Sequence, residues 1–225
     1  MASSTALASI QLRCQALLFD MDGILISSLG AVVRCWTKYA EMRGLDVENV
    51  LSITHGCRAI ETVAKLRPDL DPEAELRVIE DLEMEDTEGL SVLPGVPQLL
   101  ASLPEDRWAV VTSATERLAR VRVAAAGLPM PRYFVTADKV THGKPHPEPF
   151  LTGAALLGFP PEQCVVFEDA PSGVEAGREA GCIVVATTFS HGAEELAGAH
   201  YVIRDVTEVK VEQVSEGLVL RLPRI

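Results

Sequence analysis

Two carboxylates one residue apart follow an apolar run near the start of the chain. The run 17–19 leads directly into Asp20 and Asp22, and Gly23 comes next. Such a run predicts a buried strand, which would carry both acids to the mouth of an open α/β sheet. Adjacent anions repel unless a cation or a shared proton lies between them, and hard divalent cations prefer oxygen ligands. The pair therefore indicates a magnesium-type site, and a strand that ends in an Asp-Gly turn is the alternative.

A second acidic pair stands in the same position relative to a later apolar run. The run 165–167 precedes Glu168 and Asp169, and residues 170–173 then predict a tight turn into a helix. A second carboxylate pair at a strand end would complete the oxygen shell of a divalent cation. The alternative is that the two acids cap the following helix. Two such strand ends in one chain favour the metal site.

Two further segments could receive an anion. The apolar run 110–111 predicts a strand that delivers Ser113 just before a helix, where its hydroxyl either binds a phosphoryl oxygen or caps the helix. Lys144 lies in Gly-Lys-Pro, and the neighbouring prolines stiffen the backbone around its ammonium group. A lysine held in this way can neutralise a phosphoryl group and pair with a carboxylate, whereas an exposed loop lysine is the alternative.

The composition is that of a globular protein with an acidic charge. The 225 residues are 48% hydrophobic and 23% charged, and the formal net charge is −12. This charge argues against nucleic acid and anionic membranes as partners, because both are bound by basic surfaces. The five cysteines contain no C-x-x-C pair, which favours reduced thiols in a cytoplasmic protein over disulfides or a zinc site. Residues 1–12 are expected to form a frayed lead-in and not a signal peptide.

The elements that must position these residues fall into two groups. From 29 to about 90 the pattern predicts helices alone, and therefore a small bundle inserted after the first strand. From residue 93 on, strands alternate with helices, which predicts a parallel sheet wrapped by helices on both faces. Ser172 and Glu175 have capping-box spacing, and 217–225 is either a last edge strand or a tail. The expected helices are 31–42, 46–53, 58–66, 72–88, 116–126, 147–157 and 174–180, and the expected strands of the second group are 108–112, 133–136, 164–167, 183–186 and 201–203.

Taken in order, the four segments resemble the motifs of the haloacid dehalogenase superfamily of phosphohydrolases. The match consists of Asp20-x-Asp22-Gly23, Ser113, Lys144 in Gly-Lys-Pro and Glu168-Asp169, and it covers essentially the whole chain. Within the superfamily the chain looks most like small sugar- and polyol-phosphate phosphatases. The resemblance implies a doubly wound, Rossmann-like α/β core with a parallel sheet, formed by residues 1–27 and 93–225, and an inserted helical cap domain of residues 28–92.

The resemblance also implies the chemistry of the first acidic pair. Asp20 would be the nucleophile that attacks phosphorus to form an aspartyl-phosphate. Asp22 would protonate the leaving alkoxide and then take a proton from the hydrolytic water. At Ser27 the family often has an aspartate, which leaves the tuning of cap movement and proton transfer open.

The remaining ligands follow from the same resemblance. The Mg²⁺ ion would be held by the Asp20 carboxylate, the Asp22 backbone carbonyl and Asp169, with Glu168 close by or acting through water. Positioning and charge neutralisation supply most of the rate in phosphoryl transfer. The phosphoryl oxygens would be gathered by Ser113, Lys144 and the amides near Met21 and Ala114.

Substrate specificity is expected to come from the cap. His55 and Arg58 are predicted to face the active site and to contact substrate hydroxyls or phosphate, with Glu61 three residues further on. A helix cap plus a solvated Arg–Glu pair is the alternative. The acidic run between residues 80 and 88 is interpreted as a solvated helix face.

The predicted function is a Mg²⁺-dependent, cytoplasmic phosphatase for a small phosphorylated sugar or polyol, active as a monomer or weak homodimer. The nearest alternative is a mutase resembling β-phosphoglucomutase. Such mutases usually carry a His four residues before the cap Trp, and that place is Val32 here, ahead of Trp36. A dehalogenase would not need the full acidic set, because it requires no metal. A non-enzymatic binding module would predict a broken motif.

Overall fold

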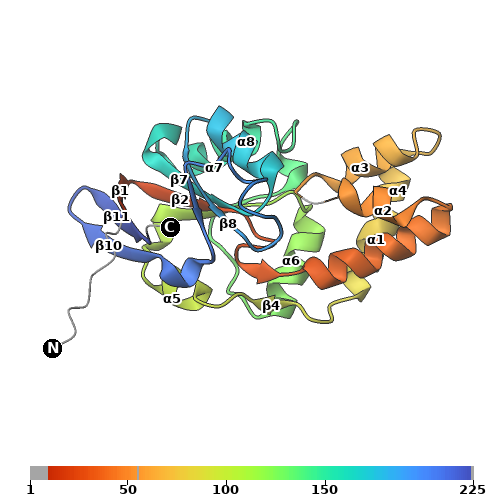
Figure 1. Cartoon of the computed structure of the whole chain (residues 1–225), viewed down its shortest axis with the longest axis horizontal. Coiled ribbons are helices and arrows are strands. Elements are labelled where there is room, and N and C mark those ends of the chain that lie inside the picture. The colour runs from red at the N-terminus through yellow and green to blue at the C-terminus, as the bar shows by residue number, and fades with distance from the viewer. Residues whose placement is uncertain (1–9, 55, 224–225) are drawn as a thin grey trace.

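A six-stranded parallel sheet forms the centre of the computed structural model, which describes residues 10–54 and 56–223 (Figure 1). Its strand order, β6-β5-β2-β7-β8-β9, places the first long strand in the interior. A strand with neighbours on both sides and helices on both faces must be apolar throughout, and all four residues of β2 are buried. The strands are β2 (Ala16–Phe19), β5 (Trp108–Val111), β6 (Phe134–Val135), β7 (Cys164–Glu168), β8 (Ile183–Thr187) and β9 (Tyr201–Ile203).

Helices cover both faces of this sheet, which confirms the doubly wound α/β fold. Side chains alternate between the faces, so Phe19 packs in one hydrophobic cluster and Leu18 in the other. The Phe19 cluster includes residues of α5 (Val96–Ala101) and α6 (Glu116–Ala126). The Leu18 cluster includes residues of α7 (Glu148–Leu157) and α8 (Pro171–Glu179). Short 3₁₀ turns lie at Glu105–Arg107, Ala137–Lys139, Pro161–Gln163 and Val206–Glu208.

Four helices inserted after the first strands form a second, smaller core at one end of the molecule (Figure 1). Trp36, Tyr39 and Ile79 are among the side chains that are buried in this core. The chain leaves the sheet through β3 (Ile26–Ser27) and returns through β4 (Ser91–Val92), and the two pair antiparallel beside the predicted boundaries at 27/28 and 92/93. The helices are α1 (Leu29–Arg43), α2 (Val47–Ser52), α3 (Ala59–Leu66) and α4 (Pro72–Glu85).

Both ends of the described chain differ from the sequence-based expectation. The sequence predicts a frayed segment at residues 10–12, but they belong to β1 (Ile10–Cys14), which pairs antiparallel with β11 (Gly217–Leu222). The strand β11 also pairs with β10 (Lys210–Val214), so it is the central strand of a three-stranded sheet and neither an edge nor a tail. The partners lie some two hundred residues apart in sequence, and a local pattern carries no signal of such pairing.

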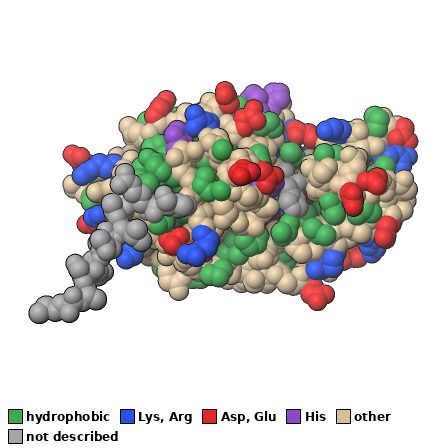
Figure 2. Space-filling model, viewed as in Figure 1, with side chains coloured by type: hydrophobic (Ala, Val, Ile, Leu, Met, Phe, Trp, Pro, Cys, Tyr) green, Lys and Arg blue, Asp and Glu red, His purple; other side chains and the backbone are tan. Residues whose placement is uncertain are grey.

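The expected capping box at Ser172 is also wrong. The helix α8 begins at Pro171, so Ser172 lies inside its first turn and the Ala170 cap position makes no side-chain hydrogen bond. Proline suits the first turn because its missing N–H would have had no helical partner. Among the described residues, no helix has the length and apolarity needed to cross a membrane. Figure 2 shows acidic and basic side chains mixed over the face in view.

Candidate active site

The two acidic strand ends meet at one edge of the sheet. The strands β2 and β7 are hydrogen-bonded neighbours in register, with Phe19 opposite Phe167. The Asp20 amide continues this ladder by donating to the Phe167 carbonyl at 2.9 Å. Carboxylate oxygens of Asp20, Glu168 and Asp169 consequently lie within 4.8 Å of one another, and all three side chains are buried. The parallel pairing therefore assembles the oxygen cluster that the sequence predicted.

Lys144 enters this cluster from the loop before α7. Its side chain is 1% exposed, and its Nζ donates to Asp20 Oδ1 at 2.5 Å and to Glu168 Oε1 at 2.7 Å. Burial lowers the pKa of Lys144, but the charges of Asp20 and Glu168 outweigh this effect and raise it. Burial raises the pKa of Asp20 to about 7, although Lys144 acts in the opposite direction. The ammonium group is thus held charged against the predicted nucleophile.

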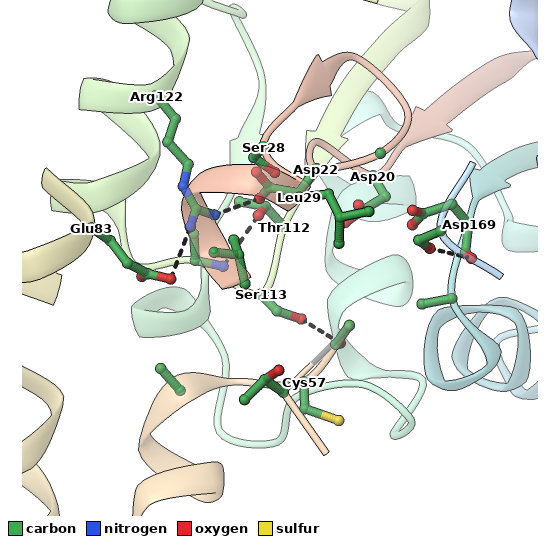
Figure 3. A pocket seen from close by; sticks show the side chains of 18 of the residues that line it. Asp20, Asp22, Ser28, Leu29, Cys57, Glu83, Thr112, Ser113, Arg122 and Asp169 are labelled. Atoms are coloured by element: carbon green, nitrogen blue, oxygen red, sulfur yellow. Dashed lines mark hydrogen bonds and ion pairs between the residues drawn. The ribbon is translucent and has the colours of Figure 1, made fainter. Parts of the chain in front are cut away.

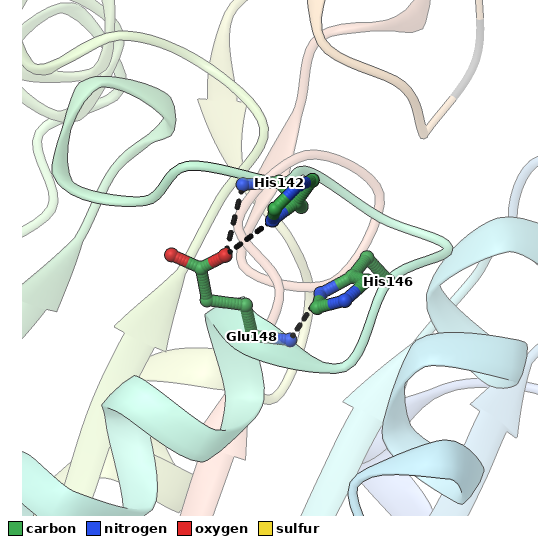
Figure 4. A group of neighbouring side chains, drawn as sticks. All are labelled: His142, His146 and Glu148. Atoms are coloured by element: carbon green, nitrogen blue, oxygen red, sulfur yellow. Dashed lines mark hydrogen bonds and ion pairs between the residues drawn. The ribbon is translucent and has the colours of Figure 1, made fainter.

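The loop that carries Lys144 is fastened by Glu148. The Glu148 carboxylate accepts hydrogen bonds from the amides of Thr141 and His142, at 2.6 and 2.9 Å, and contacts the His142 ring (Figure 4). The Thr141 amide is the main cause that lowers the pKa of Glu148 to about 2. His146 completes a group of possible ligands with His142 and Glu148, and both rings are exposed. Because the carboxylate oxygens already accept backbone hydrogen bonds, we interpret Glu148 as a residue that stabilises the loop and not as a metal ligand.

The buried charges beside Asp20 suit a divalent cation. Three carboxylates and the ammonium group of Lys144 leave a charge of −2 when all are ionised. Glu168 holds Lys144 with one oxygen, and its other oxygen accepts from the amides of Asp169 and Ala170 at 2.8 and 3.0 Å. Asp20 and Asp169 are therefore the carboxylates better placed for direct contact with a metal ion. Oxygen donors and uncompensated negative charge together fit Mg²⁺.

Gly23 makes room for this arrangement. Its φ is +84°, and a Cβ added there would lie 1.8 Å from Asp169 Oδ2. Any other residue would collide with the carboxylate and would also be strained in this left-handed conformation. The Asp-x-Asp-Gly pattern thus serves the second acidic pair as well as the first.

Asp22 is held by a residue that the sequence analysis did not identify. Arg122 of α6 donates through Nη1 to Asp22 Oδ2 at 2.9 Å, and its Nη2 lies 3.1 Å from Glu83 Oε1 of α4 (Figure 3). Oδ1 of Asp22 is buried, and no described residue is its hydrogen-bond partner. Figure 3 shows Asp22 between Asp20 on one side and Arg122 with Glu83 on the other.

The interpretation of the acidic run as a solvated helix face is wrong for its inner members. Glu80 and Glu83 are 4% and 5% exposed. The Thr115 hydroxyl donates to Glu80, so both acids point from the cap helix toward α6. Spacing gives only a partial signal, because it places Glu83 on the same helix face as the fully buried Ile79, four residues earlier, but does not show what covers that face. Arg122 likewise follows Leu118 by four residues on the buried face of its helix.

Two of the predicted phosphate-binding residues, Ser113 and Ala114, lie in the cavity wall with Asp20. The Ser113 hydroxyl donates to the Gly56 carbonyl at 2.9 Å, and the Ala114 amide donates to Thr112 Oγ1 at 3.1 Å. Ser113 and Ala114 both line the cavity. Ser113 therefore links the core to the cap loop in this conformation, and a phosphoryl group would compete for its hydroxyl.

The structure places Arg58 elsewhere than the sequence predicted. Its guanidinium group contacts Glu61 and donates to the carbonyls of Val140 and Thr141, at 3.3 and 3.0 Å. It is absent from the described residues that line the cavity, because these carbonyls draw it onto the core loop. The expected substrate contact of Arg58 is therefore corrected to a cap–core contact. His55 lies outside the described residues.

Comparison with known proteins agrees with this geometry. Residues 14–181 match a family model described as haloacid dehalogenase-like hydrolase. Hexitol phosphatase A of Escherichia coli (strain K12) is 41% identical over 214 residues, which are 93% of this chain and 99% of that protein. Glycerol-1-phosphate phosphohydrolase 2 of Saccharomyces cerevisiae is 35% identical over 216 residues, covering 90% and 86%. A solved hydrolase from Pseudomonas syringae superposes with a TM-score of 0.77 at 25% identity, covering 86% and 94%.

Proposed function

Because the chain belongs to the haloacid dehalogenase-like hydrolases and is a phosphoric monoester hydrolase, we propose that it hydrolyses a small sugar or polyol phosphate through an aspartyl-phosphate with the aid of Mg²⁺. The observation that carries the proposal is the buried cluster of Asp20, Glu168 and Asp169 with Lys144 bound to the first two. The names of the relatives, which are a hexitol phosphatase and a glycerol-1-phosphate phosphohydrolase, support the substrate class.

Asp20 is the nucleophile in this proposal. Lys144 binds its Oδ1 and so orients the carboxylate in the cavity wall. A carboxylate oxygen of Asp20 forms a bond to phosphorus while the bond from phosphorus to the ester oxygen breaks. Water then attacks the phosphorus of the aspartyl-phosphate, which releases phosphate and restores Asp20.

Asp22 carries the proton in both half-reactions. Arg122 binds its Oδ2, while its buried Oδ1 meets no partner among the described residues. We assign Oδ1 as the atom that donates the proton to the leaving alkoxide and later accepts one from the attacking water. Asp22 lines the cavity and keeps one oxygen without a partner among the described residues, which suits this role.

The phosphoryl group is received by charge and by hydrogen-bond donors. Mg²⁺, held by Asp20, the Asp22 backbone carbonyl and Asp169, would neutralise charge on the phosphoryl oxygens. Lys144 supplies a second positive charge at the same place. Ser113 and Ala114, which line the cavity, add a hydroxyl and an amide once a phosphoryl group replaces their present partners.

The cytoplasm is the proposed setting of this activity. The five cysteines are free thiols, and Cys14, Cys35, Cys164 and Cys182 are buried. Burial raises the pKa of Cys14 and Cys182 to about 12, which keeps these two thiols protonated and unreactive. Thiols without disulfide partners suit a reducing compartment.

Phosphate release from a panel of sugar and polyol phosphates in the presence of Mg²⁺ tests the proposed function. We expect the wild type to release phosphate and free alcohol in equal amounts. After acid quenching, the peptide that contains Asp20 should carry a phosphoryl group. Asp20→Asn should show no product release and no phosphorylated peptide. Isomerised sugar phosphate without phosphate release would instead support the mutase. Undiminished turnover by Asp20→Asn would refute the assigned nucleophile.

A further inference from the structure

Arg122 occupies the junction of the core and the cap. It projects from the core helix α6, its side chain is 7% exposed, and it forms ion pairs with Asp22 of the core and Glu83 of the cap helix α4 (Figure 3). A guanidinium group bound by carboxylates from two different elements has a well-defined position. Arg122 and Glu83 both line the cavity that contains Asp20. They lie beside Asp22, to which the proposed function assigns the proton of the leaving group, and the part of a substrate beyond the reacting ester is called the tail here.

The charges at this end of the cavity are already balanced or negative. Glu83 contributes −1 and Arg122 contributes +1, so their pair is neutral when both are ionised, and Asp22 adds a further −1 once it has given up its proton. Arg122 is the one Lys or Arg side chain among the described residues that line the cavity. Glu80, a second buried acid of α4, lies behind Glu83 and adds to the negative potential there. A second anionic group would find no unmatched cation.

Burial strengthens the repulsion that a second anionic group would meet at this end of the cavity. Glu83 and Arg122 have little contact with water, and repulsion between like charges is strongest where water is excluded. Burial also raises the pKa of Glu83, and the charge of Arg122 lowers it.

Uncharged hydroxyl groups, in contrast, can be bound at the same place. A carboxylate has more acceptor sites, and a guanidinium more N–H groups, than the ion pairs occupy. Ser28 adds a hydroxyl to the cavity wall, and the apolar side chains of Leu29 and Trp36 offer surfaces for carbon-bound hydrogens. A wall of a few polar groups among apolar ones is typical of sites that bind small neutral molecules.

We propose that Glu83 and Arg122 bind a neutral, hydroxyl-bearing tail, and that their matched charges reject substrates whose tail carries a second anionic group. The inference rests on the proposed function and narrows it to monophosphates of uncharged sugars and polyols. Bisphosphates and phosphorylated sugar acids are excluded by repulsion, which is a specificity device separate from the contacts that attract the correct substrate.

Two substrates that differ in one group test this inference. Sorbitol 6-phosphate and 6-phosphogluconate share a carbon skeleton and stereochemistry, but carbon 1 is a hydroxymethyl group in the former and a carboxylate in the latter. We expect kcat/KM for phosphate release by the wild type with Mg²⁺ to favour sorbitol 6-phosphate by at least about 20-fold. Glu83→Gln removes the negative charge and keeps the shape, so it should reduce this preference by at least about 5-fold.

Glu85→Gln is the matched control. Glu85 lies on the same helix and loses the same charge on substitution, but it is exposed and lies outside the cavity wall. We expect Glu85→Gln to keep the wild-type preference. An equal change in both variants would show a general effect of charge on the cap and would overturn the inference.

The wild-type comparison remains decisive even where Glu83→Gln folds poorly, because it needs no variant. Equal kcat/KM for the two substrates would overturn the inference and leave the proposed function intact. Hydrolysis of p-nitrophenyl phosphate without hydrolysis of sorbitol 6-phosphate would also overturn it, since the tail would then not be a polyol. Failure to hydrolyse these three compounds and every member of the sugar- and polyol-phosphate panel would refute the proposed function itself.

Discussion

Lys144 supplies the positive charge that binds the carboxylates at the ends of β2 and β7. It is buried, and it bonds to both Asp20 and Glu168. We predict that Lys144→Met lowers the free energy of unfolding by about 3–5 kcal/mol, because it leaves two buried carboxylates without their counter-charge. We also predict that kcat falls by about 100-fold or more, because the variant lacks the positive charge that stabilises the negatively charged phosphoryl group. Urea unfolding and steady-state kinetics measure the two effects.

Lys139→Met is the control for this prediction. Lys139 lies five residues earlier in the chain and pairs with Glu116, and its side chain is 41% exposed. Exposed ion pairs contribute about 0–1 kcal/mol, so this variant should remain close to the wild type in stability and kinetics. Near-normal stability and turnover of Lys144→Met would contradict the assigned role of Lys144.

Glu83 should make stability depend on pH in a defined direction. Burial raises its pKa above the ordinary value of 4.5, and Arg122 acts against this. The native protein then holds a proton that the unfolded chain has released, so the stabilisation is complete below pH 4.5 and is lost as the pH rises toward the pKa in the native state. The free energy of unfolding of the wild type minus that of Glu83→Gln should therefore fall as the pH rises above 4.5, by at most about 1.4 kcal/mol per pH unit.

Urea unfolding of both proteins across this pH range measures that difference. The charged and titratable groups that face Glu83 are Arg122, Asp22, Glu80 and Cys35, and all four remain in the variant. The same subtraction with the exposed Glu85→Gln should be nearly flat. A difference between wild type and Glu83→Gln that grows with pH would show that the pKa of Glu83 is lowered.

At the scale of elements, the turn after β2 serves the end of β7. Gly23 has a φ of +84°, and an added Cβ would lie 1.8 Å from Asp169 Oδ2. Gly23→Ala should therefore displace the Asp169 carboxylate, and we predict that the Mg²⁺ concentration for half-maximal activity rises about 10-fold or more. A Mg²⁺ titration of phosphate release measures this change.

Gly44→Ala separates this effect from backbone strain alone. Gly44 ends α1 with a φ of +64°, and no atom lies within 4 Å of an added Cβ. The substitution should cost about 1 kcal/mol of stability and leave the Mg²⁺ requirement unchanged. If the two alanine variants had equal Mg²⁺ requirements, crowding of Asp169 would not be the cause.

The helices α4 and α6 show how two elements complete a site together. Glu83 reaches the cavity from the cap and Arg122 from the core, and each is buried only because the other element covers it. Arg58 contributes in a similar way, since its guanidinium group attaches α3 to the carbonyls of Val140 and Thr141. The loop bonded by Arg58 is the one that leads to Lys144. The cap therefore contacts the loop that carries Lys144.

At the scale of the whole molecule, three buried carboxylates around the one ammonium group of Lys144 predict that Mg²⁺ stabilises the fold. A ligand that binds the native state alone adds about 2.7 kcal/mol at a concentration of 100 times Kd. We therefore expect the Tm of the wild type to rise with Mg²⁺ and to fall again with a chelator. Asp169→Asn should abolish the rise, because it removes one of the proposed metal ligands. A rise of equal size in Asp169→Asn would place the ion elsewhere.

Local sequence was sufficient for the strands of the six-stranded sheet and for the acidic groups at the ends of β2 and β7. Apolar runs such as 17–19 and 165–167 are buried on both faces of the sheet, and the acids that follow them mark where burial stops. Parallel pairing then brings these ends to one edge whatever the rest of the chain does. For that reason the order of apolar runs and polar ends is enough to assign Asp20 and Asp169 to one place, whereas Lys144 lies in a loop and was assigned from its Gly-Lys-Pro motif.

The tertiary structure alone decided which groups surround that place. Arg122 and Asp22 are 100 residues apart in the chain, and the pairing of β1 with β11 spans about 200. Burial of Glu83 and the turn of Arg58 onto the core loop depend on how the cap rests on the core. A local pattern reports which face of a helix is apolar, but a charged side chain becomes buried only where another element supplies its counter-charge. That supply is a property of packing between distant segments, which periodicity within one segment does not encode.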